Sequence, residues 1–243
     1  MSHGPETSNK QPAPQQGQAP CAIDGFIFDL DGTLLDTLTS LANCYNRVLT
    51  QLGFATHATD AYRYFIGDGA RRCVERCLPA NARSDAVIDQ ALALQQQDYA
   101  NSWQQDAQPY PGISAMLQQL ARDPRPLAVL SNKDQAFTQL CVSHFFPNIE
   151  FQQVVGFSAS VPHKPDPTGA RQIASALGIP CQRLALIGDT PMDMATASTC
   201  EMQALGVLWG FRDRQELLSA GATSLLATPA DLLLLVQEPV ERR

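Results

Sequence analysis

Short runs of apolar and aromatic residues recur along the chain and predict buried strands. Runs of four to six such residues, bounded by turn residues, are typical of strands that are covered on both faces. The chain has five of them, at residues 23–28, 126–130, 151–156, 184–187 and 204–208. We therefore expect a sheet with strands from both ends of the chain.

Helical periodicity fills the gaps between the later strands. Apolar residues recur at helical spacing in residues 113–121, 135–144, 168–177 and 192–198. Strands that alternate with helices of this length are typical of βαβ units. The pattern predicts an α/β fold with a mostly parallel sheet, and a final helix over the apolar run 232–236.

Residues 38–108 interrupt this alternation. Helical patterns cover residues 38–52, 70–78 and 84–103, and no convincing strand occurs there. Alternation returns after the Pro109-Tyr110-Pro111-Gly112 turn. We predict a helical cap at 38–108 inserted into a core built from 21–37 and 109–243.

The composition and charge of the chain indicate what kinds of partner and environment to expect. Residues 1–20 are rich in Pro, Gln and Gly and lack an apolar stretch, so we expect a disordered tail. A net charge of −7 gives no general attraction to nucleic acid or to anionic lipid. No run approaches the ~20 apolar residues of a membrane span, and the seven cysteines form no CxxC pair. We expect a cytoplasmic protein with buried thiols. We make no prediction of its oligomeric state.

Polar residues gather where the predicted strands end. Asp29-Leu30-Asp31-Gly32-Thr33 follows the first strand directly, and later strands are followed by Ser131-Asn132-Lys133, by His163-Lys164-Pro165-Asp166 and by Gly188-Asp189-Thr190-Pro191-Met192-Asp193. The carboxyl ends of parallel strands meet at one edge of an open sheet, where ligands bind. These segments should therefore meet around one site.

The chemistry of this set suggests phosphoryl transfer. Clustered carboxylates repel one another unless a cation neutralises them, and hard oxygen ligands favour Mg²⁺. A lysine and a hydroxyl can hold phosphate oxygens. One Asp can accept the phosphoryl group, while a second protonates the leaving oxygen and later activates water.

In the same order along the chain, these segments resemble the four motifs of the haloacid dehalogenase superfamily. The resemblance covers about residues 22–236 and implies a Rossmann-like, doubly wound core with an inserted α-helical cap. It implies that Asp29 is the nucleophile and Asp31 the general acid/base. Ser131, Asn132 and Lys164 are expected to bind phosphate. Mg²⁺ ligands are expected from Asp29, the carbonyl of Asp31, Asp189 and Asp193, the last directly or in support.

The identity of residue 31 separates relatives within the superfamily. An Asp there favours transfer to water or to a hydroxyl, whereas dehalogenases lack it, phosphonatases carry Ala and P-type ATPases carry Thr. The chain resembles phosphoglycolate-phosphatase-like enzymes most, through Ile66-Gly67-Asp68-Gly69-Ala70-Arg71 and Gly206-Val207-Leu208-Trp209-Gly210-Phe211-Arg212. Gly69 and Arg71 are the candidate substrate contacts of the cap. Cys200-Glu201 departs from the Ala-Gly pair common in that group.

Simpler interpretations stand beside these. Ser131 also suits a helix N-cap, Asn132 a turn, Lys164 a solvated lysine, and Thr190 with Asp193 a capping box. Trp209 and Phe211 suit packing.

The expected function is Mg²⁺-dependent hydrolysis of a small phosphorylated metabolite. A sugar phosphomutase could use the same residues. From another class, a non-catalytic phosphate-binding or signalling protein would lack the Asp31 partner and would not need the insert.

Overall fold

The computed structural model describes residues 22–236 and contains a six-stranded parallel sheet in the order β5-β4-β1-β6-β7-β8. The strands are β1 (Gly25–Phe28), β4 (Leu127–Asp134), β5 (Gln153–Phe157), β6 (Leu184–Gly188), β7 (Gln203–Val207) and β8 (Ser224–Leu226). Every neighbouring pair is parallel. The chain moves outward from β1 in both directions, so the predicted doubly wound α/β fold is confirmed.

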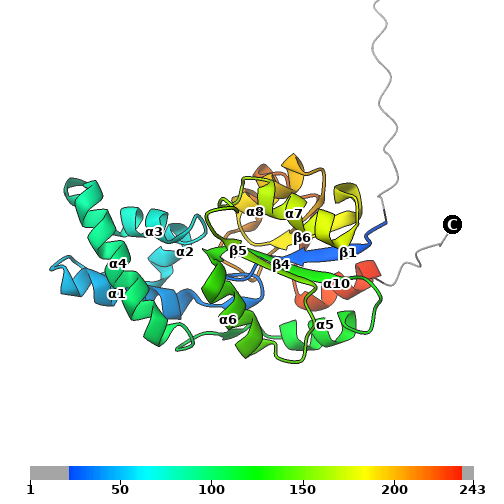
Figure 1. Ribbon diagram of the computed structural model, residues 1–243, viewed down its shortest axis with the longest axis horizontal. Coiled ribbons are helices and arrows are strands. Elements are labelled where there is room, and N and C mark those ends of the chain that lie inside the picture. The colour runs from blue at the N-terminus through cyan, green and yellow to red at the C-terminus, as the bar shows by residue number, and fades with distance from the viewer. Residues whose placement is uncertain (1–21, 237–243) are drawn as a thin grey trace, which may run out of the picture.

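Helices cover both faces of this sheet (Figure 1). One face carries α5 (Ile113–Leu120), α6 (Gln135–Phe145) and α10 (Pro229–Val236), and the other carries α7 (Thr168–Leu177), α8 (Pro191–Thr199) and α9 (Arg214–Ser219). Successive side chains of a strand point to opposite faces. Accordingly Phe26 and Phe28 lie in one buried cluster and Ile27 in the other.

The helical insert lies at the end of the sheet where β1 and β4 finish (Figure 1). It contains α1 (Leu38–Gln51), α2 (Tyr62–Phe65), α3 (Ala70–Cys77) and α4 (Asp85–Ser102), with the 3-10 turns η1 (Thr59–Ala61) and η2 (Ala80–Ala82); a third, η3 (Cys181–Arg183), precedes β6. The insert has a buried cluster of its own, in which Tyr45 and Tyr62 stack. The division into domains at residues 38 and 108 stays a prediction.

Two short strands join the insert to the sheet-bearing part. β2 (Leu35–Asp36) leads into α1, and β3 (Gln108–Pro109) returns from α4. They pair antiparallel, Leu35 with Pro109 and Asp36 with Gln108. The outgoing and returning segments are thereby held side by side, and the outgoing one begins a few residues after Asp31.

Some elements differ from the prediction. β4 extends four residues beyond the apolar run, to Asp134, because Asp134 pairs with Phe157 after a register shift. α9 and β8 were not predicted, since they are short and only partly buried. The last helix forms as predicted, but only part of its apolar run is buried: Leu232 is buried and Leu234 is exposed. The expected tail at 1–20 lies outside the described residues.

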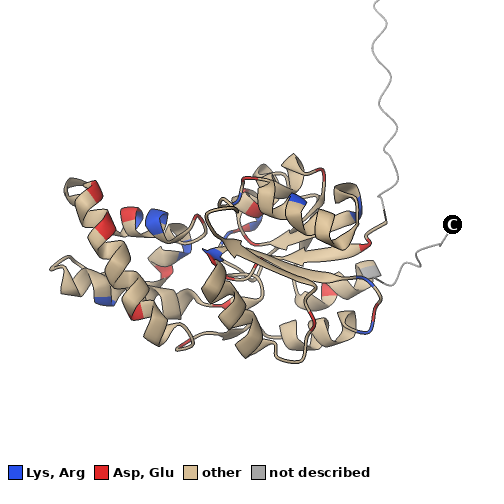
Figure 2. Ribbon diagram, viewed as in Figure 1, with Lys and Arg blue, Asp and Glu red and all other residues tan. Residues whose placement is uncertain are grey.

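Charged residues are rare along the strands and common on helices and loops (Figure 2). Among residues 22–236, no helix combines the length and apolar character that a membrane span requires.

Candidate active site

The segments expected to meet do meet, beside a cavity of about 290 Å³ between the sheet and the helical insert. Asp29, Asp31, Ser131 and Asn132 line it from the sheet side. Residues of α1, α3 and α4 line it from the insert, among them Tyr45, Cys73 and Tyr99. The site is thus enclosed by two separate parts of the fold.

The turn after β1 packs against Asp189, whose carboxylate lies beside that of Asp29. Gly32 has φ +90°, and a Cβ there would collide with the Asp189 carboxylate, so only glycine fits this turn. Thr33 Oγ1 donates to Asp189 Oδ1 at 3.0 Å. The sequence Asp-x-Asp-Gly-Thr therefore both presents two carboxylates and holds a third.

Lys164 lies at the centre of the buried charges. Its Nζ donates to Asp29 Oδ1 at 2.7 Å, to Asp193 Oδ1 at 2.6 Å and to the Leu130 carbonyl at 2.9 Å. Only 4% of the residue is exposed. Burial opposes the charged form of Lys164, but Asp193 and Asp29 raise its pKa well above the usual value. The interpretation of Lys164 as a solvated lysine does not fit this burial.

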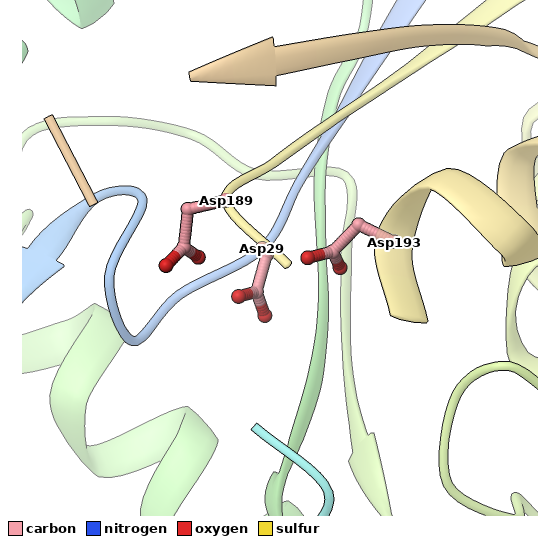
Figure 3. A group of neighbouring side chains, drawn as sticks. All are labelled: Asp29, Asp189 and Asp193. Carbon is pink, nitrogen blue, oxygen red and sulfur yellow. The ribbon is translucent and has the colours of Figure 1, made fainter. Parts of the chain in front are cut away.

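Three buried carboxylates, those of Asp29, Asp189 and Asp193, point toward one another (Figure 3). One oxygen of each lies within 4.8 Å of the others. Burial, reinforced by the neighbouring carboxylates, raises the pKa of Asp29 well above its usual value and that of Asp189 to about 7. One ammonium cannot balance three carboxylates, and an all-oxygen donor set suits a hard divalent cation. The three residues therefore fit a metal ion.

Asp193 has two functions in the structure. Its Oδ2 accepts hydrogen bonds from Thr190 N at 3.0 Å and Thr190 Oγ1 at 2.7 Å, which completes a capping box at the start of α8. Its Oδ1 contacts Lys164. Capping alone therefore does not account for all contacts of this side chain.

Asn132 and Ser131 lie at the end of the apolar part of β4. Asn132 Nδ2 donates to the carbonyls of Gly67, at 2.8 Å, and Lys164, at 3.1 Å, and its Oδ1 accepts from Lys164 N at 2.6 Å. These contacts are those of a backbone-orienting residue. Ser131 Oγ accepts from Lys133 N at 3.2 Å and lines the cavity. Phosphate binding by either residue stays a prediction.

Asp31 lies apart from the three clustered carboxylates. Thr37 Oγ1 donates to its Oδ1 at 2.9 Å, and Lys133 Nζ lies 2.9 Å from its Oδ2. The sequence analysis included Lys133 in the segment after the second predicted strand but assigned it no function. Its adjacency to Ser131 and Asn132 was the available signal, although a lysine at a strand end is more often solvated.

The two candidate substrate contacts from the insert, Gly69 and Arg71, both line the cavity. Gly69 has φ +88°, and its Cα faces His163, which stacks on Phe157 with 3.8 Å between ring centroids. Arg71 lines the cavity, yet its guanidinium pairs with Asp85, Asp89 and Glu75. Contact of Gly69 or Arg71 with a substrate stays a prediction.

The segment after β7 connects this site to the insert. Phe211 N donates to Asp189 Oδ2 at 2.7 Å, and the Phe211 ring packs in the buried cluster of the insert. Trp209 Nε1 donates to the Thr33 carbonyl at 2.9 Å. Both residues pack, as expected, and both also fix the turn and carboxylate at the site.

The chain is similar to known hydrolases in sequence. The sequence model of the haloacid dehalogenase-like hydrolases matches residues 26–207. A phosphoglycolate phosphatase from Rhodospirillum rubrum is 30% identical, over 85% of this chain and 88% of its own length. One from Pseudomonas putida is 30% identical, over 76% of this chain and 69% of its own.

The chain belongs to the haloacid dehalogenase-like hydrolase family. A solved structure of a haloacid dehalogenase-like family hydrolase from Streptococcus pneumoniae superposes with a TM-score of 0.79 at 26% identity, covering 88% of this chain and 99% of that one. The predictions of the family and of an enzyme of the phosphatase class are confirmed.

The buried carboxylates of this hydrolase predict an unusual pH dependence of stability. Asp189 has a pKa of about 7 in the folded chain, whereas in the unfolded chain it loses its proton near its ordinary value. Between the two values the folded state binds more protons, so its stability falls as the pH rises. In metal-free protein we expect the melting temperature to fall between about pH 4 and pH 7.

Calorimetry of the wild type, Asp189→Asn and Asp24→Asn checks this. Asp189→Asn should flatten the slope, whereas Asp24→Asn, at the opposite end of the first strand, should keep it. A slope unchanged in Asp189→Asn would contradict the assignment.

Proposed function

We propose that the chain is a Mg²⁺-dependent phosphatase that hydrolyses a small phosphorylated metabolite by transferring phosphate to Asp29 and then to water. The observation that carries this proposal is the position of Lys164, whose ammonium touches both Asp29 and Asp193 beside Asp189 and the cavity. Asp29, the proposed nucleophile, thus lines the cavity and lies in contact with a fixed cation, within a candidate metal site.

Mg²⁺ would be held by Asp29, Asp189 and Asp193, together with the backbone carbonyl of Asp31. When bound, the ion supplies positive charge that offsets the carboxylates and the phosphoryl oxygens. Lys164 contributes further positive charge, and the Ser131 hydroxyl is available to a phosphate oxygen. Asn132 holds the backbone of Lys164 and binds the insert through the Gly67 carbonyl.

In the first half-reaction an oxygen of Asp29 attacks phosphorus, and the bond from phosphorus to the leaving oxygen breaks. Asp31 donates a proton to that oxygen, so a neutral alcohol departs. In the second half-reaction Asp31 takes a proton from water as the water oxygen attacks phosphorus. The bond from phosphorus to the Asp29 oxygen breaks, inorganic phosphate leaves, and the Asp29 carboxylate is regenerated.

Residues 38–108 are proposed to act as a cap that excludes bulk water. Asn132 on the sheet side donates to Gly67 of the insert, and Arg212 of the segment after β7 donates to the carbonyls of Arg63 and Ile66. A cavity of about 290 Å³ suits a small substrate.

A panel of phosphorylated compounds, including phosphoglycolate, sugar phosphates, nucleotides and pyrophosphate, tests this function. With Mg²⁺, inorganic phosphate should appear at the rate at which one of the small substrates disappears. Substrate loss without phosphate release would instead support a phosphomutase. No turnover and no substrate loss in the whole panel would contradict the proposal.

Asp31→Asn should lower kcat by about 10²- to 10⁴-fold, because both proton transfers lose their donor and acceptor. Asparagine keeps an oxygen that can accept from Thr37, so the turn should persist. Steady-state phosphate release, with circular dichroism to verify folding, measures the effect. A variant that retains more than about half the wild-type rate would exclude Asp31 as the proton donor.

A further inference from the structure

The carboxylate of Asp31 is held at both of its oxygens. Thr37 Oγ1 donates to Oδ1 at 2.9 Å, and the Lys133 ammonium lies 2.9 Å from Oδ2. Each carboxylate oxygen has two lone pairs, so these contacts leave capacity for proton exchange with a molecule in the cavity, which Asp31 lines. The side chain is therefore fixed in orientation and still open to a substrate.

Lys133 is itself fixed, both at its backbone and along its side chain. It lies one residue before the end of β4, where its backbone N donates to Ser131 Oγ at 3.2 Å and its carbonyl accepts from Thr138 Oγ1 at 3.0 Å. Only 7% of its side chain is exposed. A lysine in water has many rotamers, whereas a buried one has few. The ammonium therefore has a defined position beside Asp31.

Tyr99 of α4 holds the same ammonium from the side of the insert. Lys133 Nζ donates to the Tyr99 hydroxyl at 2.8 Å and lies 4.7 Å from the centre of the ring, close enough for attraction between cation and ring. The buried Tyr99 ring packs edge-on against Phe137 of α6, with 5.0 Å between ring centroids. A chain of contacts thus runs from Tyr99 in the insert through Lys133 to Asp31.

These contacts bear on the reaction because Asp31 transfers a proton in both proposed half-reactions. A proton donor is effective only while it stays within hydrogen-bond distance of the leaving oxygen, and a small displacement lowers the rate steeply. With Thr37 as the single partner, the Asp31 carboxylate would be free to turn about its side-chain bonds. The second contact, from Lys133, prevents this rotation.

Resting on the proposed function, we propose that Lys133 and Tyr99 are positioning residues for proton transfer: Tyr99 fixes the Lys133 ammonium, and the ammonium fixes Asp31. Neither residue has to touch the substrate. The insert then takes part in proton transfer, besides covering the cavity. The effect is selective, because the pair matters most where the leaving oxygen cannot depart without a proton.

Two phosphate esters of similar size test the proposal. Benzyl phosphate has a strongly basic leaving oxygen that needs a proton, whereas 4-nitrophenyl phosphate releases an anion that is stable without one. The alcohol departs before water attacks, so kcat/KM reports the first half-reaction for both esters. In Lys133→Met, kcat/KM should fall by about 10- to 100-fold for benzyl phosphate and by less than about threefold for 4-nitrophenyl phosphate. Tyr99→Phe keeps the ring and should change the ratio in the same direction by a smaller factor.

A double-mutant cycle with Asp31→Asn decides whether Lys133 acts through Asp31. Asp31→Asn alone should lower kcat/KM for benzyl phosphate more than Lys133→Met does. Once residue 31 cannot donate a proton, adding Lys133→Met should cost less than about a further twofold. A residue that binds the substrate directly would cost the same factor in both backgrounds, so additive losses would overturn the proposal.

A merely structural function of Lys133 would give another result. The ratio of kcat/KM for the two esters is measured on one sample and does not depend on the folded fraction. Equal losses for both esters in Lys133→Met would overturn the proposal. If that variant does not fold, Tyr99→Phe decides, and an unchanged ratio there would overturn it. Arg47→Met removes an exposed ion pair with Asp98 of α4, outside the cavity, and is the matched control that should keep the ratio.

Failure of the proposed function gives a separate signature. Wild-type protein that releases no phosphate from either ester, or from the wider panel of phosphorylated compounds, would remove the phosphatase itself. Wild-type protein that cleaves both esters, with the same ratio in Lys133→Met and Tyr99→Phe, would remove only the assignment of these two residues.

Discussion

Asp29→Asn should reduce turnover by on the order of 10⁴-fold or more, since the proposed reaction passes through a bond to this carboxylate. An amide oxygen is a poor nucleophile, and no other carboxylate occupies the same position. The fold should persist, because the asparagine oxygen can still accept the hydrogen bond from Lys164. Removal of a buried charge that repels Asp189 and Asp193 should raise the melting temperature of metal-free protein.

Phosphate release under saturating substrate measures this effect, with calorimetry on the same samples. Asp24→Asn is the control, because Asp24 precedes the same strand at its other end and pairs with Arg183 at the surface. It should keep wild-type activity. An Asp29→Asn variant that retains Mg²⁺-dependent turnover would eliminate Asp29 as the nucleophile.

Removal of divalent ions should have a comparably large effect. Three carboxylates are buried together, and the ammonium of Lys164 contacts two of them, Asp29 and Asp193. The metal-free site therefore carries negative charge that opposes an anionic substrate. We expect EDTA to reduce activity to background and Mg²⁺ to restore it. A ligand that binds only the folded state also stabilises it, so Mg²⁺ should raise the melting temperature.

The matched variant for this experiment is Asp189→Asn. It lacks one of the three proposed ligands and should need much more Mg²⁺ for half-maximal activity and for half the thermal shift. Activity that survives exhaustive chelation, or a melting temperature indifferent to Mg²⁺, would contradict the metal site.

Sequence patterns predicted five of the six strands of the sheet and the meeting of the loops that follow them. Strands such as Leu184–Gly188 are apolar throughout because both faces are covered, and this composition is visible without a structure. Parallel order then requires their carboxyl ends to share one edge. That rule alone brings Lys164 to Asp29, although the two are 135 residues apart in the sequence.

The ion-pair partners of individual side chains could not be predicted in this way, because they depend on tertiary packing. Lys133 and Arg71 are both cations near glycines or polar turns, and the sequence does not say which carboxylates each one meets. Arg71 pairs with Asp85 and Asp89 on the neighbouring helix, whereas Lys133 contacts Asp31 and Tyr99. The choice depends on how α3 and α4 pack, and hence on side-chain contacts far apart in the sequence.

Short, partly buried elements were also missed. β8 has three residues and pairs along one edge only, with β7, so it lacks the continuous apolar run that marks a central strand. The extension of β4 through Ser131 to Asp134 is polar because it borders the cavity. In both places the residues lack the apolar run of a central strand, because one strand lies at the edge of the sheet and the other ends at the cavity.

The most direct test of a covalent intermediate is a rapid acid quench of Asp31→Asn with substrate and Mg²⁺, followed by mass spectrometry of the peptide that contains residue 29. With water activation impaired, phosphate should remain on Asp29, and the peptide should gain the mass of one phosphoryl group at that residue. An unmodified peptide from a variant that has released one equivalent of alcohol would contradict transfer through Asp29.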